Sequence, residues 1–420
     1  MSAVVPAHLS CVPVPTGGPS EGRPLRAAVG LPPEHLSDLL ARALEGEGPA
    51  LLPVPAGTPG ARVRELLAAM RPASVLTPEG EQPLEDAVPA DGETALVVAT
   101  SGSTGTPKGV ELSARALLAS ARASVARIGA RRGDTWLCVL PAGHISGIQV
   151  LMRALVTGSE AVHAPFSVEG VAEAARGLRP HVSLVPTQLR RLLAAGTDLS
   201  VLGTVLLGGA AAEPELLERA RAAGGRVVTT YGMSETCGGC VYDGVPLDGV
   251  GVHIDAEVPG GPGRIALSGP VLLTRYRFAP GSRVREDPLE TGPDGVLRLR
   301  TNDLGRLDDE GRLSVLGRMD EVVNTGGHKV VPGQVNALLL EHPSVAESVV
   351  VGRPDPEWGE RVCAVVVPAD PAAPPSLEQL RDWVRERLPA YAAPRELDLR
   401  ASLPLLASGK PDLVALRSGR

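Results

Sequence analysis

Hydrophobic residues over roughly the first three quarters of the chain alternate between short runs rich in Val and Leu and longer segments with Leu and Ala at helical spacing. Short apolar runs bounded by turn residues are typical of buried strands, and apolar positions three or four apart are typical of helices that bury one face. The predicted strands are 95–99, 182–185, 205–207 and 227–230, and the predicted helices are 36–44, 63–70, 114–126 and 213–222. This alternation predicts an α/β fold.

The pattern changes after about residue 318. The sequence predicts a helix at 335–340, strands at 348–351 and 361–367, and a second helix opened by Ser376, with Gln379 placed to complete a capping box. Between the strands, residues 351–356 contain glycine and proline and are predicted to form a loop. We therefore expect a large N-terminal α/β domain of layered sheets and helices, residues 1–317, and a small α+β domain, residues 318–420.

Composition and charge narrow the classes of partner. The 420 residues carry a formal net charge of −7, whereas a nucleic-acid surface needs a concentrated basic stripe. Apolar runs nowhere reach the roughly 18 residues of a membrane-spanning helix, and five scattered cysteines do not make a disulfide framework. Cys237 and Cys240 have CxxC spacing, but no second CxxC or HxxxH completes a zinc site. We expect a cytoplasmic protein without nucleic-acid or membrane partners, and leave open whether it is a homo-oligomer.

A block rich in glycine and hydroxyl residues follows the predicted strand 95–99. Its glycines let backbone N–H groups converge on an anion, its hydroxyls add donors, and Lys108 supplies a positive charge. Only three of the 41 basic residues are lysines, Lys108, Lys329 and Lys410. They are candidates for positions that need a compact ammonium, and the alternative is chance survival in a biased genome. The block is predicted to bind phosphate between a strand and a helix, and comprises Thr100, Ser101, Gly102, Ser103, Thr104, Gly105, Thr106 and Lys108.

A second block follows the predicted strand 227–230 and supplies further groups of a nucleotide site. Glu235 is a candidate ligand for Mg²⁺, the Thr236 hydroxyl is a candidate donor to the α-phosphate, and the Tyr231 ring is a candidate surface for stacking a base. A short glycine-containing segment upstream ends another strand, where a purine edge can approach the backbone. The upstream segment is Gly208, Gly209 and Ala210, and the second block is Tyr231, Gly232, Met233, Ser234, Glu235 and Thr236.

These blocks, in this order, resemble the core motifs of the adenylate-forming superfamily of acyl-CoA synthetases, adenylation domains and luciferases. The resemblance spans roughly residues 94 to 415 and includes further motifs near the C-terminus. It implies an N-terminal AMP-binding domain, a mobile C-terminal domain, and the use of ATP, Mg²⁺ and coenzyme A. It also implies that Lys410 is the catalytic lysine. The other implied roles are ribose contact for Asp303 and Arg318, the hinge for Asp320, and coenzyme A contact for Gly326, Gly327 and Lys329.

Residues 140–153 resemble the acyl-pocket helix of the 2-succinylbenzoate–CoA ligases of menaquinone biosynthesis, and residues 227–248 resemble their actinobacterial form. By this resemblance His144 lines the acyl channel and takes part in catalysis, while Ser146 and Arg153 face the second carboxylate of the substrate. Ser146 and Arg153 are seven residues apart and share one face of a helix. The alternatives are a histidine that is satisfied in the core and an arginine that is solvated at the surface.

The implied reaction activates a carboxylate as its acyl-AMP and then transfers the acyl group to the thiol of coenzyme A. Another aryl- or acyl-CoA ligase and a stand-alone adenylation enzyme that loads a carrier protein share the nucleotide motifs, so both remain open. A non-catalytic nucleotide-binding protein is disfavoured by Lys410. A serine hydrolase is disfavoured because the sequence has no GxSxG motif.

Overall fold

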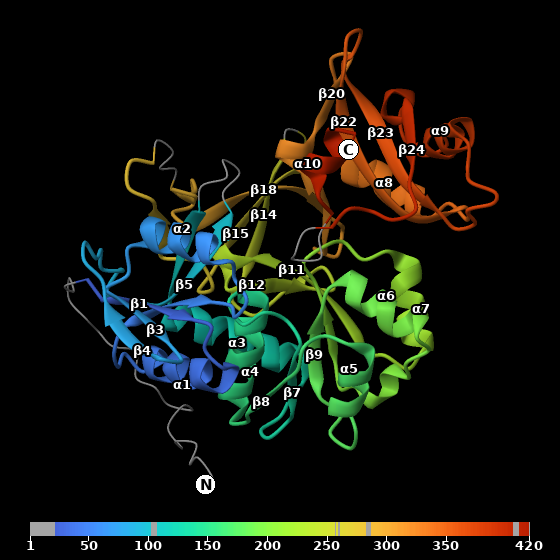
Figure 1. The fold of residues 1–420 in the computed structure, drawn as a ribbon. Helices are drawn as coiled ribbons and strands as arrows, with labels where there is room; N and C mark the ends of the chain where they lie inside the picture. The colour runs from blue at the N-terminus through green and yellow to red at the C-terminus, as the bar shows by residue number, and fades with distance from the viewer. Residues whose placement is uncertain are drawn as a thin grey trace. The chain divides into compact units, whose positions relative to one another are not determined.

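The computed structural model describes residues 22–101, 107–256, 258, 261–282, 287–405 and 411–419. The chain divides into two compact units, both of mixed α/β structure (Figure 1). The larger unit comprises Met1–Gly209, Arg219–Gly251 and Leu267–Leu299, and the smaller comprises Ala210–Glu218, Val252–Ala266 and Arg300–Arg420.

The first sheet belongs to the larger unit and gives the N-terminal region a definite fold. Strand β1 lies between β2 and β3 and is parallel to both, and helices α1 (Pro33–Leu44) and α2 (Gly60–Met70) form the crossovers. The helices predicted at 36–44 and 63–70 are thus confirmed. The strand order is β16–β6–β5–β2–β1–β3–β4, with bounds β1 Leu25–Val29, β2 Ala50–Val54, β3 Ser74–Thr77, β4 Gly80–Pro83, β5 Thr94–Ser101, β6 Pro107–Ser113 and β16 Arg275–Phe278.

The second sheet also belongs to the larger unit and has seven strands. Its strands β7, β8, β9, β10 and β11 are parallel to one another, and β12 and β13 extend the sheet with antiparallel pairing. The strands predicted at 182–185, 205–207 and 227–230 are β9, β10 and β11. The strand order is β13–β12–β11–β10–β9–β7–β8, with bounds β7 Trp136–Cys138, β8 Ala161–His163, β9 His181–Leu184, β10 Val205–Leu207, β11 Val227–Met233, β12 Gly238–Tyr242 and β13 Val245–Pro246.

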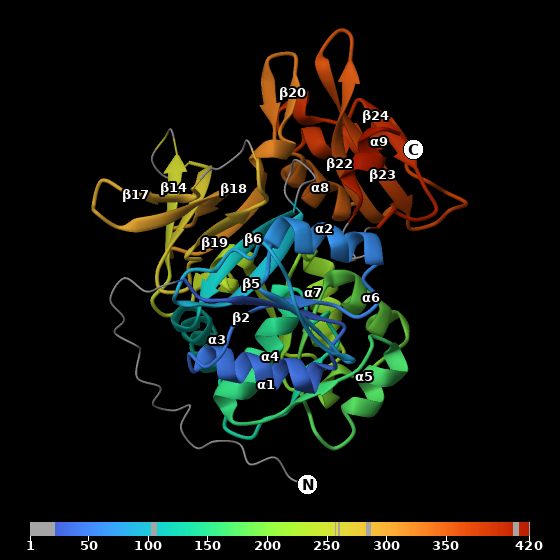
Figure 2. The ribbon, with the colours of Figure 1, turned by 60° about the vertical axis from the view of Figure 1, so that its left-hand side comes forward.

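Helix α3 lies between these two sheets, since it contacts β5 and β6 of the first and β12 of the second. Ser113 caps its N-terminus by accepting a hydrogen bond from the Ala116 N–H, and Gly129 ends it in the left-handed conformation. Helix α4 packs beside α3 (Figure 2), and it also contacts β7, β9 and β12. The helices that follow the strands are α3 Ala114–Ile128, α4 Ile145–Thr157, α5 Val168–Ala174, α6 Pro186–Ala194 and α7 Pro214–Ala222, and α3 and α7 match the helices predicted at 114–126 and 213–222.

The third sheet contains residues on both sides of 317/318, the predicted domain boundary. Strand β19 is hydrogen-bonded to β18, in a register that places Arg318 opposite Asp303. The compact unit that contains Arg318 therefore includes the chain from Arg300 onward. The domain boundary at 317/318 and the hinge at Asp320 stay predictions. The strand order is β14–β15–β18–β17 with β19 beside β18, and the bounds are β14 Gly251–Ala256, β15 Gly263–Ser268, β17 Leu289–Thr291, β18 Leu297–Leu307 and β19 Leu313–Arg318.

The last hundred residues or so form a sheet that lies wholly in the smaller unit and has a core of its own. Val335 and Leu339 of α8 and Leu380 of α9 are fully buried in this core. Ser376 caps α9 and forms the predicted capping box with Gln379. The strand order is β21–β20–β23–β22 with β24 also beside β23, and the bounds are β20 Val323–Thr325, β21 His328–Val330, α8 Pro332–Leu340, β22 Val345–Asp355, β23 Gly359–Pro368, α9 Leu377–Arg385, β24 Glu396–Leu399 and α10 Leu413–Arg417.

The prediction of a loop at residues 351–356 is wrong. Strand β22 continues through Pro354 to Asp355, and β23 begins at Gly359. Among the described strands β22 pairs only with β23 and forms the edge of its sheet. Because an edge strand has one side without ladder partners, it tolerates a residue that lacks an N–H.

Candidate active site

A lysine, a glutamate and a tyrosine from three elements of the larger unit converge on one point. Lys108 lies in β6, Glu235 in the short 3-10 helix Ser234–Thr236, and Tyr276 in β16. The Lys108 Nζ is 3.3 Å from the Glu235 Oε1 and 3.7 Å from the centroid of the Tyr276 ring. The Tyr276 hydroxyl donates a hydrogen bond of 2.8 Å to the same Glu235 oxygen. This cluster joins one residue from each of the two blocks predicted to bind ATP.

The electrostatics of this cluster suit a polyphosphate. The side chains of Lys108 and Glu235 are 28% and 12% exposed, so solvent screens their attraction only in part. Burial, and secondly the Glu235 carboxylate, raises the pKa of Tyr276, which keeps the phenol protonated and able to donate. A phosphate that pairs with the lysine frees carboxylate oxygen for a hard cation such as Mg²⁺.

Sequence reasoning missed Tyr276, which lies outside both blocks. Its signal was weak: one of four tyrosines in the chain, in the short run Arg275–Phe278, where arginine and aromatic residues alternate. Alternation of this kind is typical of a strand, but it does not say which distant residues the strand adjoins.

The turn that carries Glu235 is held by its own backbone and by Thr236. A Cβ at Gly232 would lie 2.0 Å from the Gly238 carbonyl oxygen, so only glycine fits there. The fully buried Thr236 hydroxyl accepts from the Met233 N–H at 3.0 Å and lies 2.7 Å from the Gly238 carbonyl, to which it can donate. Donation to the α-phosphate requires this hydroxyl to turn away from that carbonyl, and that role of Thr236 stays a prediction.

The described strands on either side of the predicted phosphate block pair with each other, so the block is followed by a strand and not directly by a helix. Strand β5 ends at Ser101, β6 begins at Pro107, and the two are antiparallel. The Thr100 hydroxyl donates to the Lys108 carbonyl at 3.3 Å across this strand pair. Residues 102–106, which are Gly102, Ser103, Thr104, Gly105 and Thr106, lie outside the described residues, and their phosphate role stays a prediction.

Strand β6 was missed because it contains Glu111, a residue that is rare in the middle of a buried strand. The Glu111 side chain is 1% exposed and forms ion pairs of 3.0 Å with Arg275 and Arg277 of the adjoining β16. It also accepts from the Asp91 N–H and the Thr94 hydroxyl. The ion pairs compensate the burial of the charge and fix the strand that presents Lys108.

The glycine segment and the aromatic residue predicted to hold the base lie at neighbouring strand ends. Gly208 follows β10 closely against Thr230, since a Cβ would lie 2.3 Å from the Thr230 Oγ1. Gly209, with φ +83°, and Ala210 are exposed. Tyr231 is partly exposed and lies where β11 bulges against β12. Their contact with a purine stays a prediction.

The acyl-pocket segment forms the start of α4. His144 is the N-cap residue of this helix, and His144 and Ser146 are both exposed. Arg153 lies two turns further along and is only 4% exposed. Ser146 and Arg153 therefore differ in solvent exposure although they share one face of the helix. The first turn of α4 is exposed and its third turn is buried.

Arg153 is a buried guanidinium surrounded by neutral groups. The alternative that it is a solvated arginine at the surface is therefore excluded. Its Nη2 donates to the Ser183 hydroxyl at 2.8 Å, and its Nη1 lies 3.5 Å from the Ser124 hydroxyl. Its charge is 5.3 Å from the centre of the Trp136 ring. Burial lowers the pKa of Arg153, yet an arginine keeps its proton in proteins. Among the described residues no carboxylate forms an ion pair with it.

In the smaller unit the two residues predicted to contact ribose lie together. The Arg318 Nη1 is 3.5 Å from the Asp303 Oδ1, across the β18–β19 pair. The same guanidinium makes a two-pronged contact with Asp320, with N–O distances of 2.8 and 2.9 Å. That hydrogen bonding is the largest cause of the lowered pKa of Asp320. The predicted hinge residue is thus held in the charged form by the predicted ribose arginine.

The predicted coenzyme A segment is a tight hairpin between β20 and β21. Gly326 and Gly327 have φ of +57° and +80°, the conformation that a two-residue hairpin turn requires. A Cβ at Gly326 would lie 2.5 Å from the ring of Trp358. Lys329 is exposed on β21. Lys410 lies outside the described residues, so its role stays a prediction.

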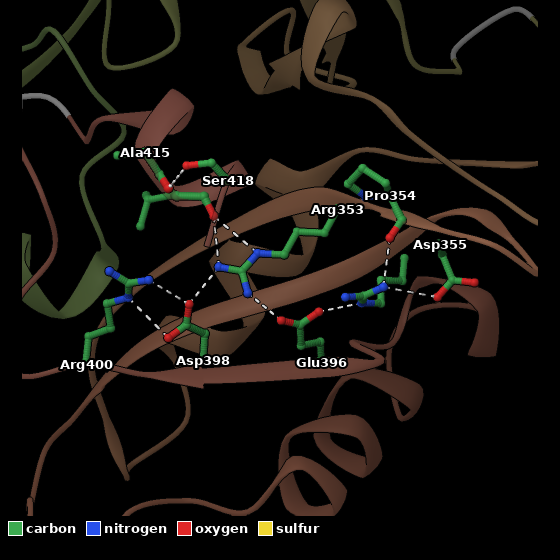
Figure 3. A network of polar contacts seen from close by, with 10 residues as sticks. Arg353, Pro354, Asp355, Glu396, Asp398, Arg400, Ala415 and Ser418 are labelled. Atoms are coloured by element: carbon green, nitrogen blue, oxygen red, sulfur yellow. Dashed lines mark hydrogen bonds and ion pairs between the residues drawn. The ribbon is translucent and has the colours of Figure 1, made fainter. Parts of the chain in front are cut away.

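The chain on either side of residues 406–410 is anchored within the smaller unit. Leu405 and Pro411 form an isolated β-bridge. Helix α10 follows, and the buried Arg353 of β22 donates to the Leu416 carbonyl at 2.8 Å. The Arg353 guanidinium also lies between the carboxylates of Glu396 and Asp398 of β24 (Figure 3).

Two features are absent from the described part of the chain. No three His, Cys, Asp or Glu side chains are grouped there as metal ligands. None of the helices seen there combines the length and the apolar character needed to span a bilayer.

Residues 47–277 match the model of the AMP-binding enzyme family, and residues 334–410 match that of the AMP-binding enzyme C-terminal domain. The chain belongs to the AMP-binding enzyme family. The superfamily and the fold class predicted from the ordered motifs are thereby confirmed.

The similar proteins narrow the class further. A probable 2-succinylbenzoate–CoA ligase of Mycobacterium tuberculosis is 42% identical over 407 residues, covering 94% of this chain and 97% of the relative. The o-succinylbenzoate CoA synthetase (MenE) of Bacillus subtilis, in complex with the acyl-adenylate intermediate OSB-AMP, has a TM-score of 0.77 at 28% identity, covering 94% and 88% of the two chains. The same enzyme in complex with ATP and magnesium ion has a TM-score of 0.75 at 28% identity, covering 95% and 89%.

Proposed function

We propose that this chain is a cytoplasmic AMP-forming acid–thiol ligase of menaquinone biosynthesis, which activates 2-succinylbenzoate with ATP and transfers the acyl group to coenzyme A. The observation that carries the substrate assignment is the buried charge of Arg153, which has hydroxyl partners but no carboxylate among the described residues. 2-Succinylbenzoate has two carboxylates, one of which becomes the thioester. The other supplies the counter-charge that the buried guanidinium lacks.

In the first step the substrate carboxylate attacks the α-phosphorus of ATP and pyrophosphate leaves. Lys108 and the hydroxyl-rich block hold the departing phosphates, and Lys410 stabilises the charge that develops on the reacting oxygens. Mg²⁺, when bound, neutralises phosphate charge, and Glu235 is the residue to hold it. His144 and Ser146, exposed at the start of α4, line the entrance for the acyl group.

In the second step the thiol of coenzyme A attacks the acyl-AMP carbonyl and AMP leaves. Asp303 and Arg318 hold the ribose in both steps, and their 3.5 Å ion pair supports a shared contact. Asp320 is the hinge about which the C-terminal domain turns. Gly326, Gly327 and Lys329 then contact coenzyme A.

The test is AMP release in the presence of coenzyme A across a panel of acids. 2-Succinylbenzoate is expected to have a far higher kcat/KM than benzoate or a fatty acid, because a monoacid leaves Arg153 unpaired. Arg153→Ala should remove about 2–5 kcal/mol of this discrimination, the usual loss when a buried charge pair is truncated. Equal kcat/KM for benzoate in the unmodified protein would exclude the substrate assignment and leave the ligase class intact. Replacing coenzyme A with a carrier protein in the same assay tests the acceptor.

A further inference from the structure

Gln149 is a buried amide whose hydrogen-bonding atoms both lack partners. It lies in α4, its side chain is 3% exposed, and neither its Oε1 nor its Nε2 has a hydrogen-bond partner. Of the described residues it is the only one with two such atoms. Buried amides are nearly always paired, so an unpaired one calls for a specific explanation.

Buried hydroxyl groups on α3, the helix beside α4, do have hydrogen-bond partners, so of these two helices the lack of partners is specific to the α4 side chains. The Ser124 hydroxyl is 2.7 Å from the Tyr242 hydroxyl, and the Ser120 hydroxyl donates to the Cys237 carbonyl at 3.3 Å. One turn beyond Gln149 on the same face of α4, Arg153 also has a buried atom without a partner, its Nε. Three unpaired atoms therefore lie on one stripe of one helix.

At Gln149 this stripe faces the start of β12, directly after the Glu235 turn. A Cβ at Gly238 would lie 3.1 Å from the Gln149 Cγ and 3.7 Å from the Ile145 Cγ1. Gly238 has φ +96°, a conformation that residues with a side chain rarely adopt. The glycine leaves the Gln149 side chain close to the backbone of the turn that carries the predicted ATP ligands.

We propose that Gln149 is a specificity-determining residue that recognises the ketone of the acyl substrate. This inference rests on the proposed function. In the liganded site the Gln149 Oε1 accepts from the Arg153 Nε–H, the Gln149 Nε2–H donates to the ketone oxygen, and the Arg153 guanidinium pairs with the retained carboxylate. The three unpaired atoms are then all satisfied. The class of ligand is a keto diacid, in which a carbonyl oxygen lies within a few bonds of a carboxylate, and 2-succinylbenzoate has this arrangement.

The test compares 2-succinylbenzoate with 4-(2-carboxyphenyl)butanoate, in which a methylene replaces the ketone. The unmodified enzyme should prefer the ketone by about 10- to 100-fold in kcat/KM, because the analogue leaves the amide unpaired. Gln149→Leu should bring this ratio close to one by losing activity on the ketone alone. Its melting temperature should stay the same or rise, since an unpaired buried amide has been removed. Gln149→Met is the second variant if Gln149→Leu does not fold.

Thr204→Val is the matched control. Thr204 is fully buried in the larger unit and its hydroxyl also lacks a partner, but it is not on α4. This control should leave the ratio between the two acids unchanged. The inference is overturned if the unmodified enzyme activates both acids equally, or if folded Gln149 variants keep the preference for the ketone. If the enzyme activates another acid but not 2-succinylbenzoate, the proposed function fails together with the inference.

Discussion

Replacing Arg153 with methionine separates an arginine that stabilises the fold from one that binds substrate. Methionine keeps the length of the side chain and removes the charge. Replacing buried ionic groups with apolar ones of similar volume is neutral or stabilising by about 1–4 kcal/mol. The loss of the 2.8 Å hydrogen bond to Ser183 offsets about 1–2 kcal/mol of this. We therefore expect the free energy of unfolding of the unliganded protein to rise by about 1 kcal/mol.

The matched control is the same substitution at Arg277, a buried arginine that does have a carboxylate partner. Arg277 pairs with Glu111 at 3.0 Å and donates to the carbonyls of Met70, Val88 and Pro89. Breaking a buried pair in this way costs about 3–5 kcal/mol, because the half-exposed Arg275, the other ion-pair partner of Glu111, compensates the buried carboxylate only in part. At about 2–4 °C per kcal/mol, the Arg277→Met protein should melt roughly 6 to 20 °C lower.

Thermal melts with and without 2-succinylbenzoate read out both effects. A ligand at about 100 times its dissociation constant stabilises the folded protein by about 2.7 kcal/mol. Loss of the ion pair to Arg153 costs about 2–5 kcal/mol of binding, so Arg153→Met should reduce this stabilisation to less than about 1 kcal/mol at the same ligand concentration. If Arg153→Met instead destabilised the unliganded protein as much as Arg277→Met, Arg153 would be a structural core residue and the substrate argument would fail.

Four further predictions concern the reaction itself. Lys108→Ala should slow acyl-AMP formation by about 10²–10³, measured by pyrophosphate exchange into ATP, and unchanged exchange would exclude its phosphate role. Tyr276→Phe removes one hydrogen bond to Glu235 worth about 1 kcal/mol, so exchange should fall by several-fold, and a larger loss would mean that the ring also moves. Gly326→Ala places a side chain at a φ of +57° against an indole ring, so thioester formation from supplied acyl-AMP should slow while exchange continues. Lys410→Ala should slow exchange while thioester formation from supplied acyl-AMP continues. Equal slowing of both half-reactions would contradict a mechanism in which the C-terminal domain takes a different conformation for each half-reaction.

Much of the fold was predictable because its signals are local. The capping box of Ser376 and Gln379 and the apolar runs of β9, β10 and β11 depend on residues a few positions apart. Strand β6 was not predictable in this way. Its Glu111 is stable in a buried strand because Arg275 and Arg277 lie beside it, and they are more than 160 residues away in the sequence. No local pattern encodes such a partner.

The same distinction applies to the candidate site. The two blocks were recognised from their residue types, whereas their meeting at Lys108 and Glu235 depends on how β6 and β11 are placed by the sheets. Helical spacing put Ser146 and Arg153 on one face of α4, but it could not say that one end of this face is exposed and the other buried. Burial depends on what packs against the helix.

Two of the three lysines, Lys108 and Lys329, lie at positions where the structure shows no need for lysine rather than arginine. Lys108 pairs with a carboxylate and lies over an aromatic ring, two contacts that an arginine makes equally well. Lys329 is exposed on β21, where an arginine serves equally well as a solvated charge. Neither position requires lysine for folding in a chain that otherwise uses arginine. We therefore interpret the two retained lysines by what the proposed function has them bind, which is phosphate for Lys108 and coenzyme A for Lys329, and chance retention is the alternative.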